Sequence, residues 1–400
     1  MDLYLQMGYG MKNHAIELIK KWQGGTVILS PKNITLEQMK KTAKELNKIN
    51  GQVLFDPQFY MPRISQKNLQ KHLYWPDNYS KSTFFNGPGI KNMIDILLNE
   101  YIYPLHTSGF IIPTLFLSDI NNTWNTVTEN IIAEVERKQI SIPKFLTLCL
   151  GTKLLEKEES IHLLLEELED YPVDGFYIIP EHPNKKYLVD NESWLLNLLD
   201  FAAGLKLLNK KVILGYANHQ FLFMALAKVD ALCSGIWLKT RVFPIEEFRN
   251  EEEGTARRSV WYYCPQALSE YQIPSLDLAQ IAGLLERLKT PDEFESNYAD
   301  PLFTGVQPTI VNWVEREAFR HYLNCLKKQC IDVSKDSYEN TRDYLKLLFE
   351  TAQELSDLFR QNGIRAKHRD FGNVAENNLA VLDAFDNIRG LVFSANWNNL

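Results

Sequence analysis

Short apolar runs alternate with helix-like stretches through residues 3–236 of this chain. Several of the runs (FIIPTLFL, FLTLCL, GFYII, KVILGY) are hydrophobic almost without interruption, as strands of a parallel sheet covered on both faces are. The runs span residues 3–7, 26–30, 52–55, 110–117, 145–150, 175–179, 211–216 and 229–236. Strands of this number, alternating with helices, predict an α/β fold of the (β/α)8 barrel type.

Between these runs, apolar residues recur every three or four positions, which predicts helices. The expected helices span residues 11–22, 36–49, 124–137, 156–169, 194–208 and 221–228. A helix over 265–288 can close the barrel, and helices over 313–328, 338–362 and 377–387 follow. We therefore expect a barrel over residues 1–290 and a helical subdomain over 291–400. An open dinucleotide-binding sheet is the alternative, but no GxGxxG motif follows the first strand.

The composition is that of a soluble protein, and we expect it in the cytoplasm. No apolar run is long enough to span a membrane, and no basic region precedes the first strand as in a signal peptide. The five cysteines are scattered and none is placed for zinc binding, so we expect reduced thiols, no metal and no cofactor. The net charge of −7 disfavours a uniformly basic nucleic-acid binder but leaves room for a local basic face. The oligomeric state stays open.

Two carboxylates stand directly after apolar strands, where barrel enzymes carry their active sites. Asp56 ends the third strand and is followed by Pro-Gln-Phe-Tyr, an aromatic setting that can raise a carboxyl pKa. Glu181 follows GFYIIP. Two carboxylates around one cavity can do the acid–base or nucleophilic work of bond cleavage at the anomeric carbon of a sugar. We predict Asp56 and Glu181 to be catalytic; a helix cap or a rim salt bridge is the alternative for each.

Other polar or aromatic residues near strand ends are candidates for substrate binding. They are Gln6, Gln58, Tyr60, Asp119, His182, Asn218 and His219. The long segment 60–89, rich in Pro, Tyr, Phe and Asn, is predicted to be a lid or a binding loop, because long loops in compact domains commonly have such roles.

Basic residues gather at three places in the sequence. One pair follows the eighth strand, a usual place for phosphate binding in barrels; a second pair lies just beyond; the third group belongs to RQNGIRAKHR, residues 360–369. The residues predicted to contact a nucleic-acid backbone are Lys239, Arg241, Arg257, Arg258, Arg365, Lys367 and Arg369. Ordinary solvated charge is the alternative.

The order of these motifs resembles the tRNA-guanine transglycosylase-like superfamily of barrels. LGYANHQFLFMALAKVDALCSG, residues 214–235, is similar to that family's Gly-x-Gly turn, amphipathic helix and eighth strand. VDGFYIIPE, ending at Glu181, resembles its sixth strand. LFDPQFY and FLSD bring Asp56 and Asp119 to the places of its base-recognising aspartates. The resemblance covers residues 1–290 and implies a pocket for a nucleotide base.

Three features of that family are missing here. Cys233 and Ser234 stand near the place of its nucleophilic aspartate, Leu150 replaces its guanine-reading glutamine, and its zinc-binding cysteines are absent. The resemblance therefore implies base removal by water rather than base exchange, on DNA in preference to tRNA. Some antiphage DNA glycosylases resemble this group, so a role in antiviral defence is also implied. The alternatives are a transglycosylase that inserts a deazaguanine-type base, a non-catalytic barrel that binds a nucleotide or partner, and a small-molecule barrel enzyme.

Overall fold

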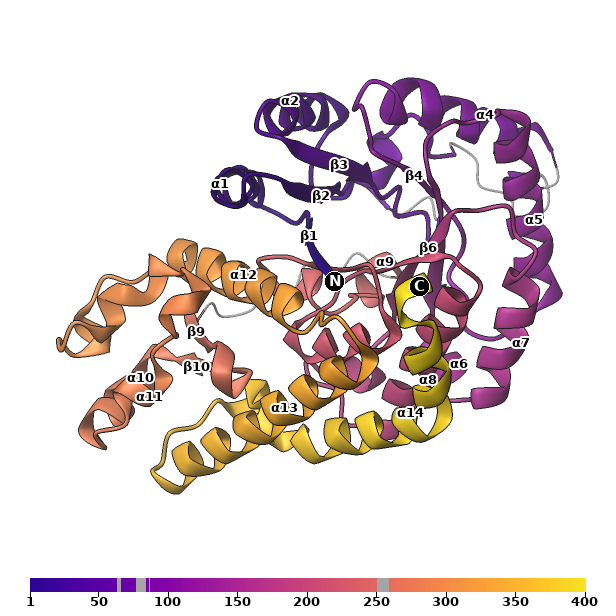
Figure 1. Ribbon diagram of the computed structural model, residues 1–400. Helices are drawn as coiled ribbons and strands as arrows, with labels where there is room; N and C mark the ends of the chain where they lie inside the picture. The colour runs from indigo at the N-terminus through magenta and orange to yellow at the C-terminus, as the bar shows by residue number, and fades with distance from the viewer. Residues whose placement is uncertain (63–65, 77–83, 86, 250–258) are drawn as a thin grey trace.

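The computed structural model describes residues 1–62, 66–76, 84–85, 87–249 and 259–400. At its centre, eight strands pair in parallel in the order β3-β2-β1-β8-β7-β6-β5-β4 (Figure 1). The strands are β1 (Asp2–Gln6), β2 (Gly25–Leu29), β3 (Gly51–Phe55), β4 (Phe110–Ile112), β5 (Lys144–Leu150), β6 (Gly175–Pro180), β7 (Lys211–Leu214) and β8 (Ala231–Ser234). Each lies at one of the apolar runs of the sequence, and the predicted barrel is confirmed.

Two backbone hydrogen bonds join the ends of this order, β3 and the chain around β4. Ser108 N–H donates to the carbonyl oxygen of Val53 at 2.9 Å, and Phe116 N–H donates to that of Tyr60 at 2.8 Å. The barrel is therefore nearly closed. Strand β4 is shorter than the predicted 110–117, because Pro113 follows it and has no N–H for the ladder.

Helices surround the strands as the sequence predicts (Figure 1). They are α1 (Lys12–Trp22), α2 (Leu36–Asn47), α4 (Pro88–Ile96), α5 (Asn122–Arg137), α6 (Thr152–Leu155), α7 (Glu158–Leu168), α8 (Glu192–Leu207) and the 3-10 helix η4 (His219–Ala227). Side-chain caps fix several of their starts: Asn121 accepts from the Trp124 N–H and Asn191 from the Trp194 N–H. Such caps satisfy backbone donors that a helix start leaves unpaired.

The last helix of the barrel is not the one expected over 265–288. That stretch forms part of the hairpin β9 (Trp261–Cys264) and β10 (Ser269–Gln272), then α10 (Ile273–Ile281) and α11 (Leu285–Leu288). Instead α12 (Glu315–Asp332) packs against β1, α1 and η4, in the gap in the helical ring. The Trp22 indole of α1 donates to the Asn324 side chain of α12 at 3.1 Å.

The C-terminal helices bind the barrel on one side, drawn in orange to yellow in Figure 1. The long helices α13 (Tyr338–Gln361) and α14 (Ala375–Asn396) pack on each other, and α14 also packs on α8, where Arg389 pairs with Asp200 at 2.6 Å. A second apolar core, separate from that of the barrel, includes Tyr262, Leu302 and Phe359. None of the helices in the described ranges is long and apolar enough to cross a lipid bilayer.

Candidate active site at the mouth of the barrel

Asp56 lies just past the carboxyl end of β3, and its side chain is completely buried. Its Oδ1 accepts the backbone N–H of Gln58 at 2.9 Å. Its Oδ2 accepts the hydroxyl of Tyr60 and, at 3.5 Å, the hydroxyl of Tyr177 in β6. Three donors thus converge on one buried carboxylate, from two sides of the barrel.

Two glutamine side chains extend this network to β1 and β7. The Tyr177 hydroxyl donates to Oε1 of Gln6 at 3.0 Å, and Nε2 of Gln58 donates to the Tyr216 hydroxyl at 2.9 Å. Nε2 of Gln6 is buried and has no hydrogen-bond partner among the described residues. Leaving a buried donor unpaired is unfavourable, so Gln6 keeps a group suited to a bound molecule. We define the mouth cluster as Gln6, Asp56, Gln58, Tyr60, Tyr177 and Tyr216.

Backbone strain accompanies this cluster. Gln58 and Tyr216 have φ angles of 52° and 53°, in the left-handed region that bulky residues rarely adopt. Their side chains contact each other, so the hydrogen bond between them holds two strained strand ends together. The neighbouring Gly215 is required for space, since a Cβ there would come within 2.7 Å of the Tyr177 ring. Strain of this kind is concentrated at functional sites.

Burial sets the proton affinities of the cluster. It raises the pKa of Asp56 from 3.8 to about 6, although the hydrogen bonds from Tyr60, Gln58 and Tyr177 act in the opposite direction. Burial, followed by the negative charge of Asp56, raises the pKa of Tyr60 and of Tyr177 well above 10. Near neutral pH, Asp56 can therefore take up or release a proton, while the phenols remain hydrogen-bond donors.

Glu181 follows β6 and is less buried, with 19 % of its side chain exposed. Its Oε2 accepts the Thr152 N–H at the start of α6 at 3.0 Å, and its Oε1 lies 3.9 Å from the Arg249 guanidinium. Glu181 thus makes a hydrogen bond to a helix start and a salt bridge, the two structural roles considered above as alternatives to catalysis. Burial, then the charges of Asp56 and Glu181, raise the pKa of the Cys149 thiol well above its ordinary value. Both carboxylates therefore lie near Cys149, at the carboxyl end of β5.

Two phenylalanines cover the mouth cluster. The Phe243 ring lies 5.2 Å, between centroids, from both Tyr60 and Tyr216, and the Phe248 ring lies 5.0 Å from Tyr60. Both belong to residues 242–249, which follow β8 and include the short helix α9 (Glu246–Arg249). We call residues 242–249 the lid.

The segment expected to form a lid, 60–89, reaches the mouth only in part where it is described: Gln66 Nε2 donates to the carbonyl oxygen of Phe248 in the lid. It supplies Tyr60 to the mouth cluster and lines a separate cavity of about 280 Å³, bordered by His72, Trp75 and Phe84, to which Asp56 does not contribute. Residues 63–65, 77–83 and 86 of this segment lie outside the described part of the chain.

Three predicted substrate-binding residues make their side-chain contacts with groups other than Asp56. Asp119 is exposed and pairs with Lys157 at 3.3 Å. Asn218 caps η4, accepting the Gln220 N–H at 2.9 Å. His182 is buried in the helical layer between Trp194 and Phe221. In this conformation none of them contacts the mouth cluster, because local capping and packing already engage their side chains.

His219 is also remote from Asp56 and is completely buried against the rings of Tyr187, Tyr263 and Tyr322. Burial lowers the pKa of His182, His219 and the buried His321 from 6.5 to about 4. All three are therefore neutral at pH 7.

These histidines predict acid lability. The pKa of each histidine is lower in the folded than in the unfolded protein. Their contribution to the free energy of unfolding is therefore complete above pH 6.5 and is lost as the pH falls towards 4. The loss is about 2 kcal/mol per histidine at pH 5. Protonation of Asp56, whose folded pKa is raised, stabilises the folded state over the same range and offsets part of this loss. Urea unfolding at pH 7.5 and pH 5 measures it. The variant His182→Gln should reduce this pH dependence, whereas the exposed-site control His106→Gln should not; equal slopes in all three proteins would contradict the prediction.

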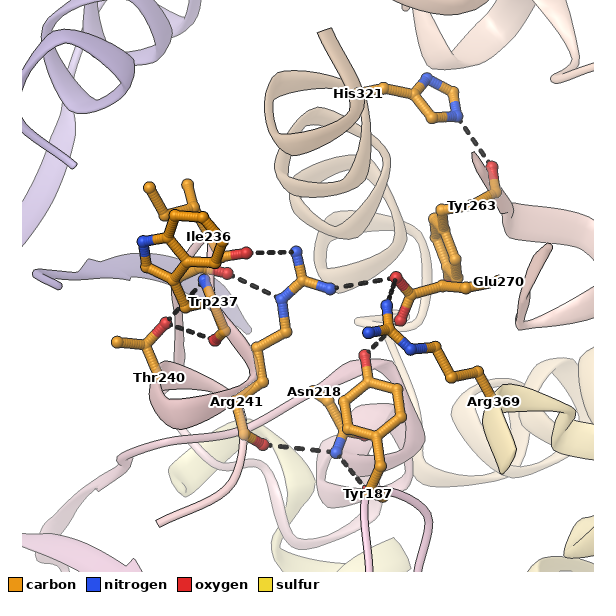
Figure 2. Close-up of polar contacts among 11 residues, drawn as sticks. Tyr187, Asn218, Ile236, Trp237, Thr240, Arg241, Tyr263, Glu270, His321 and Arg369 are labelled. Atoms are coloured by element: carbon orange, nitrogen blue, oxygen red, sulfur yellow. Dashed lines mark hydrogen bonds and ion pairs between the residues drawn. The ribbon is translucent and has the colours of Figure 1, made fainter. Parts of the chain in front are cut away.

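Two arginines predicted to contact a nucleic-acid backbone are buried on one carboxylate instead (Figure 2). Arg241 lies 3.3 Å and Arg369 2.7 Å from Oε2 of Glu270 in β10, and the Tyr187 hydroxyl donates to Oε1 at 2.6 Å. The guanidinium of Arg241 also lies over the Tyr322 ring. Arg241 is only 3 % exposed and Arg369 9 %, so the prediction that these two side chains contact a nucleic-acid backbone is wrong for this conformation.

The electrostatics of this ion-pair cluster fit a structural role. Burial alone would raise the pKa of Glu270, but the charges of Arg369 and Arg241 outweigh it and lower the pKa to about 2. Arg241 follows β8, whereas Glu270 lies in the hairpin β9–β10 and Arg369 lies between α13 and α14. The cluster therefore fastens the end of the barrel to the C-terminal elements.

The remaining predicted basic residues are more accessible. Lys239 is 56 % exposed and pairs with Glu247 of the lid. Arg365 and Lys367 are exposed and line a cavity of about 300 Å³ together with Arg360, Asp370 and Asn373. Arg257 and Arg258 lie outside the described residues.

Sequence reasoning missed Tyr177, Tyr216 and Glu270. Tyr177 lies within a continuous apolar strand and Tyr216 follows Gly215, so neither stands out as polar. The available signal was alternation: Tyr177 and Ile179 share a face of β6, and that face points into the barrel. Glu270 carries no local signal, because its partners are distant in sequence.

No group of three or more His, Cys, Asp or Glu side chains suited to a metal ion occurs in the described ranges. Comparison of the sequence with protein-family models and with curated proteins finds no match.

Proposed function

We propose that this protein is an N-glycosylase that removes a modified base from nucleic acid, with Asp56 as the central catalytic group. The observation that carries the proposal is the buried Asp56 carboxyl at the barrel mouth, whose pKa is raised to about 6 amid phenol donors. A carboxylate that ionises near neutral pH can act as a general base towards water. In its ionised form it also stabilises positive charge that develops on a sugar ring.

The reaction that we propose is hydrolysis. Water bonds to the anomeric carbon while one of its protons passes to Asp56; the bond from that carbon to the base nitrogen breaks, its electron pair stays with that nitrogen, the nitrogen takes a proton from solvent, and Asp56 returns its own proton to solvent. The hydroxyls of Tyr60 and Tyr177 stay protonated, and their hydrogen bonds hold the Asp56 carboxylate in place for this step. The amides of Gln6 and Gln58 offer donors and acceptors that suit the edge of a base. We assign Glu181 as the second carboxylate, with the role of orienting the sugar.

Hydrolysis is favoured over base exchange by the end of β8. Cys233 is completely buried, and burial raises its thiol pKa well above the ordinary value, so it stays protonated. A protonated thiol is a poor nucleophile, and a covalent enzyme–sugar intermediate at this strand is disfavoured. DNA is the preferred substrate, and removal of modified bases from phage DNA is the biological role that the sequence resemblance suggests.

The test is base release from defined polymers. The protein is incubated with phage genomic DNA carrying bulky modified bases, with unmodified DNA and with tRNA. Released bases are identified by mass spectrometry and abasic sites are counted, with and without a labelled free deazaguanine. We expect base release and abasic sites in modified DNA only. Incorporation of the label would support the transglycosylase instead, and binding without release would support a non-catalytic barrel.

A further inference from the structure

The lid closes the mouth through charge as well as through its two phenylalanines. Oε2 of Glu247 lies 3.0 Å from the ammonium of Lys32, and the same carboxylate pairs with Lys239. Glu246 lies 3.7 Å from Lys185. Burial alone would raise the pKa of Glu247, but the two lysines lower it overall, so this carboxylate is anionic at neutral pH.

The three lysines come from widely separated parts of the chain. Lys32 follows β2, Lys185 follows β6 and Lys239 follows β8, so they meet only because the strands of a barrel end on one face. We call Lys32, Lys185 and Lys239 the rim lysines. Glu247 bridges Lys32 and Lys239, and the adjacent Glu246 pairs with Lys185, so the rim holds two neighbouring anions in this structure.

We propose that the rim lysines are a phosphate-binding site for nucleic acid, and that Glu246 and Glu247 occupy it as internal substitutes for phosphate until a polynucleotide displaces the lid. The inference rests on the proposed function and adds to it the partner chemistry and the regulation of the site. Carboxylate and phosphate groups bind ammonium groups in the same way, and a polynucleotide brings more charge and releases counterions.

Displacement of the lid also exposes both carboxylates of the candidate site. Phe243 and Phe248 cover the cluster around Asp56, which is completely buried in the closed state. Arg249, at the end of the lid, lies 3.9 Å from Glu181 and 3.0 Å from Glu246. Movement of this one segment therefore opens the mouth and frees Glu181 from its cation, so that polymer binding and site assembly become one event.

The coupling predicts how affinity changes. If binding requires the open state, the affinity measured is the intrinsic affinity reduced by the fraction of open molecules. Removing the charge of the lid raises that fraction. We expect the Glu246→Gln/Glu247→Gln variant to bind nucleic acid about tenfold more tightly at equal salt.

The experiment measures anisotropy of a fluorescein-labelled 20-nucleotide single-stranded DNA from 50 to 300 mM NaCl. The matched control is Glu158→Gln/Glu159→Gln, which removes the same charge from two adjacent exposed glutamates in the first turn of α7. A Lys32→Gln/Lys185→Gln/Lys239→Gln variant should bind about 100-fold more weakly and show a shallower salt dependence, by about two units of slope on single-stranded DNA. Circular dichroism verifies that each variant is folded.

Hydrogen–deuterium exchange of residues 242–249 provides the second readout. We expect the DNA to accelerate exchange in the lid, and inorganic phosphate at equal ionic strength to leave it unchanged. The proposal is overturned if the Glu246→Gln/Glu247→Gln variant binds no more tightly than its control, or if lid exchange does not respond to DNA. Opening by phosphate alone would instead assign the rim to a small phosphorylated ligand. Neither readout needs catalysis, so lid opening by DNA combined with no base release from the modified phage DNA would refute the proposed function and leave this inference standing.

Discussion

Replacing Asp56 with asparagine should give a protein that is inactive in base release and yet more stable than the wild type at pH 8. The folded pKa of Asp56, about 6, lies above the unfolded value of 3.8. The folded state therefore binds the proton more tightly than the unfolded state does. The free energy of unfolding falls as the pH rises from 3.8 through 6, because Asp56 ionises in this range. A shift of this size corresponds to about 2–3 kcal/mol, which asparagine recovers because it stays neutral.

Urea unfolding at pH 8 and pH 5 measures this gain, which should narrow at the lower pH as wild-type Asp56 becomes protonated. The exposed-site variant Asp292→Asn is the control and should change stability by less than about 0.5 kcal/mol. A wild type more stable than Asp56→Asn at pH 8 would show that the charged carboxylate is a structural requirement. The combination of higher stability and lost activity is the signature of a functional group held in an unfavourable environment.

Replacing Glu270 with glutamine should have the largest effect on stability. The substitution keeps the shape of the side chain but leaves the guanidiniums of Arg241 and Arg369 buried without their counter-charge. Breaking a buried ion pair in this way costs about 3–5 kcal/mol. Because Arg241 is attached to the end of β8 and Arg369 to the C-terminal part, the contact between the two should loosen first (Figure 2).

Urea unfolding of Glu270→Gln, with the exposed-site variant Glu354→Gln as control, tests this expectation. Hydrogen exchange should also accelerate in β9 and β10 before it does in β1 to β7. If the free energy of unfolding falls by less than about 1 kcal/mol, the arginines find other partners or solvent. The cluster would then not hold the C-terminal elements to the end of the barrel.

The sequence predicted the barrel well, because periodicity reports which faces of strands and helices are buried. It located Asp56 for the same reason: a charged residue directly after a continuous apolar strand has few places to lie except the barrel end. It failed where the environment depends on distant residues. Arg369 looks like a surface cation in RQNGIRAKHR, and only the fold brings it onto Glu270, 99 residues earlier.

The lid shows a similar limit. Residues 242–249 are short and mixed in charge, and nothing local distinguishes Phe243 and Phe248 as covers of Asp56. The longer segment 60–89 has the composition of a binding loop, and the sequence therefore predicted the lid there instead. The eighth helix was misplaced because chain order favours the next helical stretch, whereas the hairpin β9–β10 intervenes and α12 fills the gap.

The rate of base release between pH 5 and pH 8.5, for the wild type and for Asp56→Asn, is the most direct test of the account. A general base with a pKa of about 6 must be ionised to act, so the wild-type rate should rise with pH through about 6 and then level off. Asp56→Asn, verified as folded at each pH, should lose at least about 100-fold at the plateau and show no such rise. Wild-type rates in Asp56→Asn, or a wild-type rate that does not depend on pH in this range, would contradict the assignment of Asp56 as the catalytic carboxylate.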